Sequence, residues 1–534
     1  MTPEGLETEK KYDVDPGAGL PALREIPGVG RVGEASEAVL EAVYFDTDDL
    51  TLASRGITLR RRTGGADAGW HVKLPAESGT ESAPQQRREI HAPLGQAAVV
   101  PEKLLAHVYV YLRGAQLAPA ARLTTKRTTH ALYGDDGVHL ADFADDRVGS
   151  ESLGGAGQHQ EWREWELELV HGSAELFASA EPILAAAGAW PAAHKSKLGR
   201  ALGEAWPQPS GQRSSGQQPS GQRGEIPDEE AAEPHKKARD KKEPVSGVVT
   251  AYLGGQIGEI LACDPGVRLE EPDAVHNMRT ATRRLRSTLA VYRTLFGAAA
   301  VRRLRDELQW LGRILGSPRD AEVMRERLRA HAAELPPGQA SRAVQDSVER
   351  ELGNRFDAGY RKALEVLAAD RYFRLLDDLE DFRDNPPVRP PASGPGGKVA
   401  AKRVKKTVRR LRRSHRAAMR AVEGAAHETA LHQVRKDAKR LRHAAESVVP
   451  LYGKRAVKLA KAAHRQQKIL GDHHDSVMAR VFLGKLGRGP ELPEAVADAY
   501  RSLLEREERI AARDEAKYRK ARRKARKLLK RGVN

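Results

Sequence analysis

The sequence of 534 residues contains a single cysteine, Cys263. One thiol cannot build a disulfide framework or a zinc site of several thiolates within one chain, and this composition is typical of a reducing cytoplasm. Residues 1–14 are polar and charged, so we expect no signal peptide. No apolar run reaches the length of about 20 residues that a membrane-spanning helix needs. We therefore expect a cytoplasmic protein without a membrane partner.

Aromatic residues make up only 5% of the chain, and the motif GxxxxGK[ST] does not occur. The missing motif argues against a P-loop nucleotidase. The shortage of aromatic side chains argues against a protein that stacks the bases of single-stranded nucleic acid. Charged residues, in contrast, make up 31% of the chain, and the formal net charge is +17. Such a positive excess favours an anionic partner.

Two segments rich in Pro, Gly, Ser and Gln divide the chain. The first, 206–245, contains the pentapeptide PSGQR twice and predicts a flexible linker. The second, 385–398, has a density of Pro and Gly that neither a helix nor a strand tolerates. Residues 1–205 alternate like short strands between turns, whereas 246–530 have the i, i+3, i+4, i+7 spacing of amphipathic helices. We therefore predict an α+β multidomain protein with an antiparallel β-tunnel or barrel and flanking helices first, and an all-α domain second.

Charged and apolar side chains alternate along several predicted strands of the N-terminal half. Arg60 and Arg62 share one strand face, and Glu164, Glu166 and Glu168 share another. A solvated sheet surface has the same pattern. Closing the sheet, however, would gather both signs of charge around one polar lumen. Arginine and lysine there suit phosphate oxygens, and carboxylates beside a phosphate call for a divalent cation such as Mg²⁺ or Mn²⁺.

An ordered set of motifs in this half resembles the CYTH family, also called triphosphate tunnel metalloenzymes. The resemblance covers about residues 1–205 and rests on Glu7-Thr8-Glu9-Lys10-Lys11 (ExExK), Tyr44-Phe45-Asp46-Thr47, Leu59-Arg60-Arg61-Arg62, Lys73, Arg87 with Glu89, Glu164 with Glu166 and Glu168, and Ser196-Lys197. It implies an eight-stranded antiparallel tunnel that hydrolyses or rearranges triphosphates with a divalent metal.

The resemblance also assigns roles to side chains. Its implied catalytic residues are Glu7, Glu9 and Lys11. Its implied phosphate-binding cations are Lys11, Arg60, Arg62, Lys73, Arg87, Arg127 and Lys197. Its implied metal ligands, direct or through water, are Glu7, Glu9, Glu164, Glu166, Glu168 and Asp145. Arg122 and Lys126 lie on the strand face opposite Arg127, so these three cations cannot all line one lumen.

The helical half contains an internal repeat. The segment 275–286 (VHNMRTATRRLR) returns at 431–442 (LHQVRKDAKRLR) with an offset of 156 residues (432 − 276). The segments LGSPRD at 315–320 and LGDHHD at 470–475 keep an offset of 155 residues (475 − 320). Two distant motifs with nearly the same offset predict two similar helical bundles related by a pseudo-twofold axis. We expect each LGxxxD segment to be a turn, in which glycine ends one helix and aspartate caps or orients the next.

The two bundles should occupy the halves 246–384 and 399–530. Each copy of the repeat sets a stripe of basic residues along one helix face. These stripes are His276, Arg279, Arg283 and Arg286 in the first copy, and His432, Arg435, Lys439 and Arg442 in the second. One such stripe is usually a solvated face, but its duplication with histidine in the same place indicates a shared purpose.

Residues 401–420 carry ten Lys and Arg and no acidic residue. Like charges four residues apart destabilise an isolated helix, so an anionic ligand would relieve a cost here. Arg409, Arg413 and Arg416 lie toward one side of this predicted helix, and we predict that they bind that ligand.

This half resembles the CHAD domain, a histidine-containing helical domain that is often fused to CYTH. The VHxxRxxxRRLR element, its second copy and both LGxxxD segments carry the resemblance over about residues 245–530. It implies two four-helix bundles with a basic groove that binds inorganic polyphosphate. The two basic stripes are implied to form that groove.

The sequence therefore predicts an inorganic triphosphatase whose helical domain binds polyphosphate and targets the protein to it, in the cytoplasm or on polyphosphate granules. The alternative is a non-catalytic polyphosphate-binding protein. The presence of all the carboxylates that a metal site needs favours the enzyme. Nucleic acid is not expected as a specific partner, because contacts to phosphates alone bind DNA weakly and with a steep salt dependence.

Overall fold

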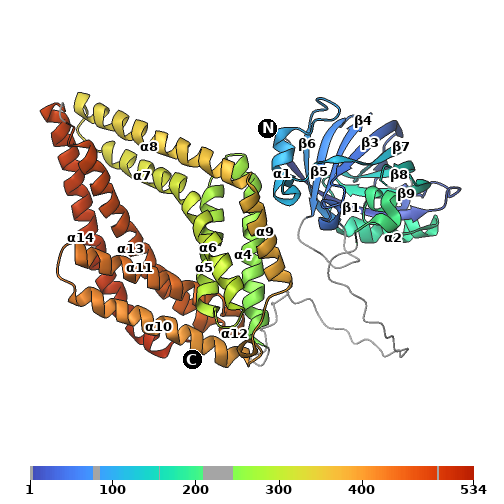
Figure 1. Ribbon diagram of the computed structural model, residues 1–534. Helices are drawn as coiled ribbons and strands as arrows, with labels where there is room; N and C mark the ends of the chain where they lie inside the picture. The colour runs from blue at the N-terminus through green and yellow to red at the C-terminus, as the bar shows by residue number, and fades with distance from the viewer. Residues whose placement is uncertain (1–3, 76–84, 155–156, 208–243, 490–491, 534) are drawn as a thin grey trace. The chain divides into compact units, whose positions relative to one another are not determined.

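The chain divides into two compact units, Met1–Glu225 and Ile226–Asn534 (Figure 1). Most of the linker predicted at 206–245 lies outside the residues that the structure describes. The structure is a computed structural model that describes residues 4–75, 85–154, 157–207, 244–489 and 492–533.

The N-terminal unit consists mainly of strands, with three α-helices in its described part. Its strands are β1 (Glu4–Val14), β2 (Arg31–Val32), β3 (Ser36–Asp46), β4 (Thr58–Thr63), β5 (Gly69–Pro75), β6 (Gln85–Ala92), β7 (Ala118–Tyr133), β8 (His139–Ser152), β9 (His159–Leu169) and β10 (Ala189–Pro191). Its helices are α1 (Glu102–Leu112), α2 (Glu175–Ala186) and α3 (Lys197–Leu202), with 3-10 turns η1 (Leu23–Glu25), η2 (Ala53–Arg55) and η3 (Gly203–Ala205).

Within the described residues, eight of these strands close into an antiparallel barrel. Their order is β1-β6-β5-β4-β3-β7-β8-β9, and β9 pairs with β1 to complete the ring. The short strands β2 and β10 extend β7 and β1. Closure removes the sheet edges, and it confirms the antiparallel tunnel that the sequence predicted.

The barrel is apolar outside and polar inside. Trp70, Val72 and Ile90 on the outer face of β5 and β6 pack against Leu104 and Val108 of α1. On the other side of β1, Trp165 and Leu167 of β9 pack against Leu176 and Phe177 of α2 (Figure 1). Because strand side chains alternate, covering the apolar faces with helices turns the charged faces of the same strands into the lumen.

The C-terminal unit is helical throughout its described part. The first half contains α4 (Val245–Arg268), α5 (Ala274–Tyr292), α6 (Ala298–Ile314), α7 (Gly316–Ala332), α8 (Gln339–Leu367) and α9 (Asp370–Asp384). The turn η4 (Pro390–Ala392) leads to the second half, which contains α10 (Gly396–Arg420), α11 (Ala425–Glu446), α12 (Val449–Tyr452), α13 (Lys454–Leu486) and α14 (Glu494–Arg531).

The two halves meet through equivalent helices. Helix α4 contacts α10, α5 contacts α11, α7 contacts α13 and α8 contacts α14. A twofold axis brings each element against its own counterpart, so this pattern is the one that the predicted pseudo-twofold arrangement requires. The tyrosine hydroxyl of Tyr292, at the end of α5, also lies 3.0 Å from Ser447 Oγ, just after α11.

One expectation about the repeat was wrong. Gly316 does begin a new helix, because α6 ends at Ile314 and α7 starts at Gly316. Its counterpart Gly471 lies in the middle of the continuous helix α13 and makes no turn. What the two glycines share is their neighbour: a Cβ at Gly316 would lie 3.6 Å from the Arg279 guanidinium, and one at Gly471 would lie 3.7 Å from Arg435. A larger side chain at either glycine would therefore push an arginine of the basic stripe away.

No described helix combines the length and the apolar character that crossing a bilayer requires.

Two glycines of α8 provide a matched test of how this helix packs. A Cβ at Gly353 meets nothing within 4 Å, whereas a Cβ at Gly359 would lie 2.9 Å from the Pro318 backbone nitrogen and from Ser317 Oγ. We expect Gly353→Ala to raise the free energy of unfolding by about 0.5–1 kcal/mol. We expect Gly359→Ala to lower it by about 1–3 kcal/mol, because α7 must move. Denaturant titration of both variants checks this, and equal shifts in the same direction would contradict the close approach of α7 and α8.

Candidate functional site

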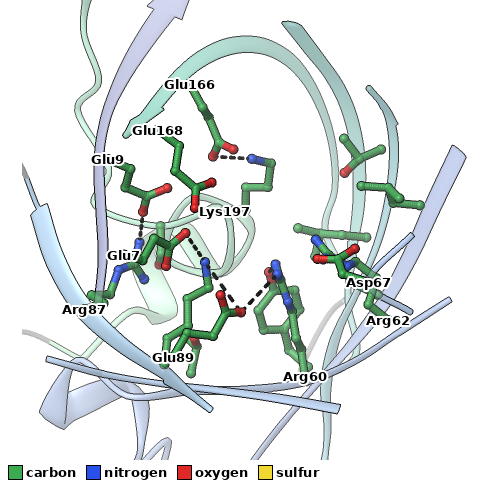
Figure 2. A pocket seen from close by; sticks show the side chains of 18 of the residues that line it. Glu7, Glu9, Arg60, Arg62, Asp67, Arg87, Glu89, Glu166, Glu168 and Lys197 are labelled. Carbon is green, nitrogen blue, oxygen red and sulfur yellow. Dashed lines mark hydrogen bonds and ion pairs between the residues drawn. The ribbon is translucent and has the colours of Figure 1, made fainter. Parts of the chain in front are cut away.

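The lumen of the barrel contains a cavity of about 110 Å³. All seven cations that the sequence predicted for the tunnel line it, as do Glu7, Glu9, Glu166 and Glu168 (Figure 2). Strand register explains the gathering, because directly opposed residues of antiparallel strands point to the same face. Glu7 opposes Arg87, Glu9 opposes Glu168, and Lys11 opposes Glu166.

Buried ion pairs link Glu9 of β1 to a cation of the same strand and to one of the neighbouring strand β6. Lys11 Nζ lies 3.0 Å from Glu9 Oε2 and also pairs with Glu166. Arg87 donates to Glu9 Oε1 at 2.5 Å. Burial disfavours the charged form of Glu9, but Lys11, Arg87 and Lys73 outweigh it and hold its pKa well below the usual value. Burial lowers the pKa of Lys11 to about 8.

A second cluster surrounds Lys197, at the start of α3. Its ammonium nitrogen lies 2.9 Å from Asp146, 2.8 Å from Glu164 and 2.6 Å from Glu166. One oxygen from each of these three buried carboxylates lies within 4.8 Å of the others, which is a spacing that suits a bound cation. Burial disfavours the charged lysine, but Asp146 and Glu164 outweigh this and raise the pKa of Lys197. The ammonium group therefore occupies the position that a metal ion would need.

Two carboxylates of the lumen are left without full partners. Glu7 Oε1 pairs with Lys73 Nζ at 2.5 Å, but Glu7 Oε2 is buried and accepts no hydrogen bond. Glu168 points into the lumen beside Glu7 and Glu9 (Figure 2), and it makes no ion pair within the described part of the chain. Burial, followed by repulsion from Glu7 and Glu9, raises the pKa of Glu168 to about 7. Both groups would gain from a cation placed between them.

The opposite wall of the lumen is formed by β3, β4 and the turn that follows β4. Arg60 donates to the Tyr44 hydroxyl at 3.3 Å, and Arg62 pairs with Asp67 of the turn. Burial, together with the charges of Arg60 and Arg127, lowers the pKa of Arg62 to about 9. This wall is therefore rich in cations whose charge an anionic ligand would stabilise.

His71 connects that turn to the lumen. Its Nε2 lies 3.0 Å from the Asp67 carbonyl oxygen, and its Nδ1 lies 2.9 Å from Glu89 Oε1. Glu89 in turn lies 3.9 Å from both Arg60 and Lys73. His71 therefore helps to fix the carboxylate that sits between two of the predicted phosphate-binding cations.

The structure corrects the assignment of Asp145. Its neighbour Asp146 opposes Glu164 and points inward, whereas Asp145 opposes Trp165 and points outward. Outside the lumen, both Asp145 oxygens accept hydrogen bonds from Arg163, at 2.8 and 2.7 Å. The acidic position of the lumen belongs to Asp146, which Arg127 holds through Nε and a terminal nitrogen at 2.7 and 2.5 Å.

Sequence reasoning also missed several residues that line the lumen. Tyr44 belongs to the YFDT motif, and Glu89 shares its strand face with Arg87, so both could have been found from alternation. Asp67 lies in the turn after β4, where no periodicity predicts which way a side chain points.

The helical unit contains a groove of about 1080 Å³ that is lined by residues of α5, α6, α7, α8, α11 and α13. Arg279 and Arg283 of α5 and Arg435 of α11 line it, together with His276. Further basic residues that the sequence did not single out also line it: Arg313, Arg319, Arg327, Arg355, Lys362, His474 and Lys485. Only two carboxylates line the described groove, Asp320 and Asp475, and Asp320 Oδ1 pairs with Arg279 at 2.9 Å.

Only some of the residues that were predicted to bind polyphosphate line this groove. The His432 ring packs on His474 with ring centroids 4.6 Å apart, so it borders the groove. Arg286 and Lys439 are not among its lining residues, and Arg442 pairs instead with Glu446 at 2.6 Å. Three more predicted cations lie on the exposed face of α10, away from the groove: Arg409, Arg413 and Arg416.

Histidines in and beside the groove are held neutral by their surroundings. Burial, followed by the charges of His474, Lys436 and Arg435, lowers the pKa of His432 to about 4. Burial and Arg435 lower the pKa of His474, although Asp320 partly opposes this. An anion in the groove would reverse these shifts.

Comparison with known proteins identifies both units. The CYTH domain family model matches residues 5–198, and the CHAD domain model matches residues 251–484. Among curated proteins, two uncharacterized proteins from Mycobacterium tuberculosis, one from strain CDC 1551 / Oshkosh and one from strain H37Rv, are each 37% identical over 500 residues, which is 90% of this chain and 88% of the relative.

Solved structures resemble parts of the chain. PptA from Streptomyces chartreusis is 19% identical, with a TM-score of 0.45 over 52% of this chain and 99% of its own. The CHAD domain of the plant Ricinus communis is 26% identical, with a TM-score of 0.43 over 55% of this chain and 96% of its own. A putative adenylyl cyclase from Hippeastrum, described as having a dominant triphosphatase activity, is 13% identical, with a TM-score of 0.20 over 36% of this chain and 93% of its own. Because the mycobacterial relatives match nearly end to end and both domain models match in order, the chain belongs to the family of proteins in which a CYTH domain is followed by a CHAD domain.

Proposed function

We propose that the barrel hydrolyses inorganic triphosphate or short polyphosphate with Mg²⁺ or Mn²⁺, and that the helical domain binds inorganic polyphosphate and targets the protein to it. In this proposal the CYTH domain spans 1–205, a linker spans 206–245 and the CHAD domain spans 246–530. Membership of a family of triphosphate tunnel hydrolases supports the reaction class. The substrate rests on the chemistry of the lumen.

The observation that carries the proposal is that two buried carboxylates of the lumen lack full partners while cations gather on the opposite wall. Glu7 Oε2 is buried without a hydrogen bond, and Glu168 is buried without an ion pair in the described chain. The opposite wall presents Arg60 and Arg62, and burial together with the charges of Arg60 and of Arg127 on the neighbouring strand β7 lowers the pKa of Arg62 to about 9. A triphosphate would satisfy the cations, and a divalent cation would satisfy the carboxylates.

The residues present fit a divalent ion in a particular way. Lys197 already neutralises Asp146, Glu164 and Glu166, so an ion there would have to displace an ammonium group. In the second set of Glu7, Glu9 and Glu168, Glu7 pairs with Lys73, and Glu9 pairs with Lys11 and Arg87, but Glu7 Oε2 accepts no hydrogen bond and Glu168 makes no ion pair within the described chain. The oxygens of this set are not gathered as closely. Mg²⁺ is often held by one or two carboxylates plus substrate phosphates, which suits this second set. When bound, the ion would supply charge neutralisation and orient the attacking water.

The chain's own residues would do the rest. The two walls place cations on both sides of the cavity, so a triphosphate would be held in line. Lys73 and Arg60 are fixed by Glu89, and Arg127 is fixed by Asp146, so these donors need little rearrangement when charge develops on the phosphoryl oxygens.

We expect Glu168→Gln to lower metal-dependent phosphate release from tripolyphosphate by about 100-fold or more, because it removes a carboxylate that the metal and substrate need. The matched control is Asp145→Asn, which changes an acidic residue on the outer face of the same barrel. We expect this control to retain most of the activity. Steady-state phosphate release with Mg²⁺ or Mn²⁺ measures both.

Equal activity in both variants would contradict the assignment of the lumen. The alternative function, a barrel that binds phosphate chains without hydrolysing them, is favoured by one observation: Lys197 and Arg127 already neutralise the carboxylates Asp146, Glu164 and Glu166. Binding of tripolyphosphate to the wild type without any release of phosphate would establish that alternative.

The groove of the helical domain is the second part of the proposal. Its basic residues outnumber its two carboxylates. Burial, together with the nearby charges of Arg279 and Arg435, lowers the pKa of Arg283 to about 10. A flexible chain with one charge per phosphate would relieve that repulsion along the whole groove. Polyphosphate is such a chain, and it has no apolar part that would need a pocket.

We expect the affinity for polyphosphate to rise as the pH falls from 8 to 5. In the empty groove the lowered pKa values keep His432 and His474 neutral at pH 7. A bound polyanion raises both values despite Arg435, Lys436 and His473 nearby, so binding takes up protons. Each proton taken up changes the binding constant by up to about tenfold per pH unit. Titration calorimetry across this pH range measures the effect.

The double variant His432→Gln and His474→Gln serves as the control, because glutamine keeps polar side chains but cannot be protonated. It should bind with an affinity that changes much less with pH. A wild-type affinity that does not vary between pH 8 and 5 would contradict the role of these histidines.

A further inference from the structure

The outer face of α10 is an uncompensated basic surface. Along 25 residues the helix carries no acidic side chain. Its exposed cations are Lys402, Lys405, Lys406, Arg409, Arg410, Arg412, Arg413, Arg416 and Arg420. Among the described residues, only Arg410 has a carboxylate partner, Asp437 at 2.7 Å. The buried side of the same helix is apolar, with Val404, Val408 and Leu411 in the bundle core, so the charge is confined to the outside.

The C-terminal part of α14 also carries exposed cations. The ring of Tyr518 in α14 lies 6.1 Å from the ring of His415 in α10, which places the two helices together. After Glu515 the helix contains no acidic residue, and its exposed cations include Lys520, Arg523, Lys524 and Lys527. We call the exposed cations of α10 the outer basic face.

The pseudo-twofold repeat supplies an internal comparison. The bridge between Pro244 and Pro395 joins the residues just before α4 and α10, which sets an offset of 151 residues for this pair (395 − 244). At this offset Lys402, Lys406, Arg409 and Arg413 correspond to Ala251, Gly255, Gly258 and Ala262, all of which are exposed. The fold therefore does not require cations on this face. The first bundle has none at these positions, whereas the second has four.

The cations also repel one another, and a bound anionic ligand would relieve this cost. Lys405 and Arg409, Arg409 and Arg413, and Arg412 and Arg416 are each four residues apart on one helix, where like charges repel. None of the residues of the outer basic face lines the groove. Residues of α5, α6, α7, α8, α11 and α13 line the groove, and none comes from α10, so the two basic surfaces are separate.

We propose that the outer basic face is a second binding surface for inorganic polyphosphate, so that one helical domain holds two chain segments and can bridge separate chains. This inference rests on the proposed function, in which the groove holds the first segment. The face fits a flexible phosphate chain because its charges follow the helix for its whole length and α10 has no aromatic residue for stacking bases. A protein partner would need an apolar centre, and the exposed apolar residues of α10 are limited to its C-terminal end, at Met419.

The test uses the full-length protein, with its barrel first saturated by Mn²⁺ and a non-hydrolysable imido analogue of triphosphate, and polyphosphate chains too short to reach both surfaces of the helical domain. The barrel then neither hydrolyses these chains nor adds to the number of chains bound. Titration calorimetry should give two chains bound per wild-type molecule and one for the triple variant Arg409→Gln, Arg413→Gln and Arg416→Gln. Mixing with long chains should give turbid, cross-linked assemblies for the wild type and clear solutions for the triple variant. A thermal midpoint at or above that of the wild type is expected for the variant, because repulsion along α10 is reduced, and it shows that the fold is intact.

The matched control removes the same amount of charge elsewhere. Arg342→Gln, Arg350→Gln and Arg374→Gln change three exposed arginines of α8 and α9, and this protein should still bind two chains. The groove variant Arg279→Gln and Arg435→Gln should keep one chain, on the outer basic face.

Two outcomes would count against the inference, and they differ from failure of the proposed function. One chain bound by the wild type, with unchanged affinity in the α10 variant, would overturn the second surface and leave the groove proposal standing. A surface that duplex DNA occupies and polyphosphate does not would also overturn it. Absence of polyphosphate binding in every protein would instead remove the proposed function of the helical domain.

Discussion

The mutual neutralisation of buried charges inside the barrel is the interaction on which the rest of the N-terminal unit depends. The outward faces of the strands are covered by α1 and α2, so the inward faces must bury their charges. A buried charge is tolerated only when it is paired. Lys11 with Glu166, Arg127 with Asp146, and Lys197 with three carboxylates supply that pairing. The network also fixes the side chains that we propose to bind phosphate, before any ligand arrives.

This balance limits what can enter the lumen. An anion that entered alone would add negative charge near the carboxylates of Glu7 and Glu168, and it would compete with Glu7 for Lys73. A bare divalent cation would approach Arg87 and Lys73. A triphosphate and a divalent cation together add charges of opposite sign, so each can replace partners that the other displaces. The geometry therefore favours binding of the two as a unit.

Much of this could be predicted from the sequence, and the failures have physical reasons. Strand alternation identified Arg60, Arg62 and the three glutamates of β9. In the structure Arg60, Arg62, Glu166 and Glu168 line the cavity of the lumen, whereas Glu164 is buried beside it and pairs with Lys197. Alternation could not choose between Asp145 and Asp146, because a shift of one residue exchanges the two faces of a strand. The repeat predicted two equivalent bundles, but it could not show that Gly471 lies within a continuous helix. The first and last residues of each basic stripe are ten positions apart, which is about 15 Å along a helix, so one end of a stripe can lie beyond a groove, as Arg286 and Arg442 do.

The most direct test of this account is the affinity of the full-length protein for Mn²⁺, measured by titration calorimetry with and without a non-hydrolysable imido analogue of triphosphate. The values are corrected for the metal that the analogue binds in free solution. The account predicts weak metal binding to the empty barrel and binding strengthened by about 10- to 100-fold when the analogue is present, with the same factor for the analogue when the metal is present. Equal metal affinity in both conditions would contradict the claim that triphosphate and metal enter the lumen as a unit.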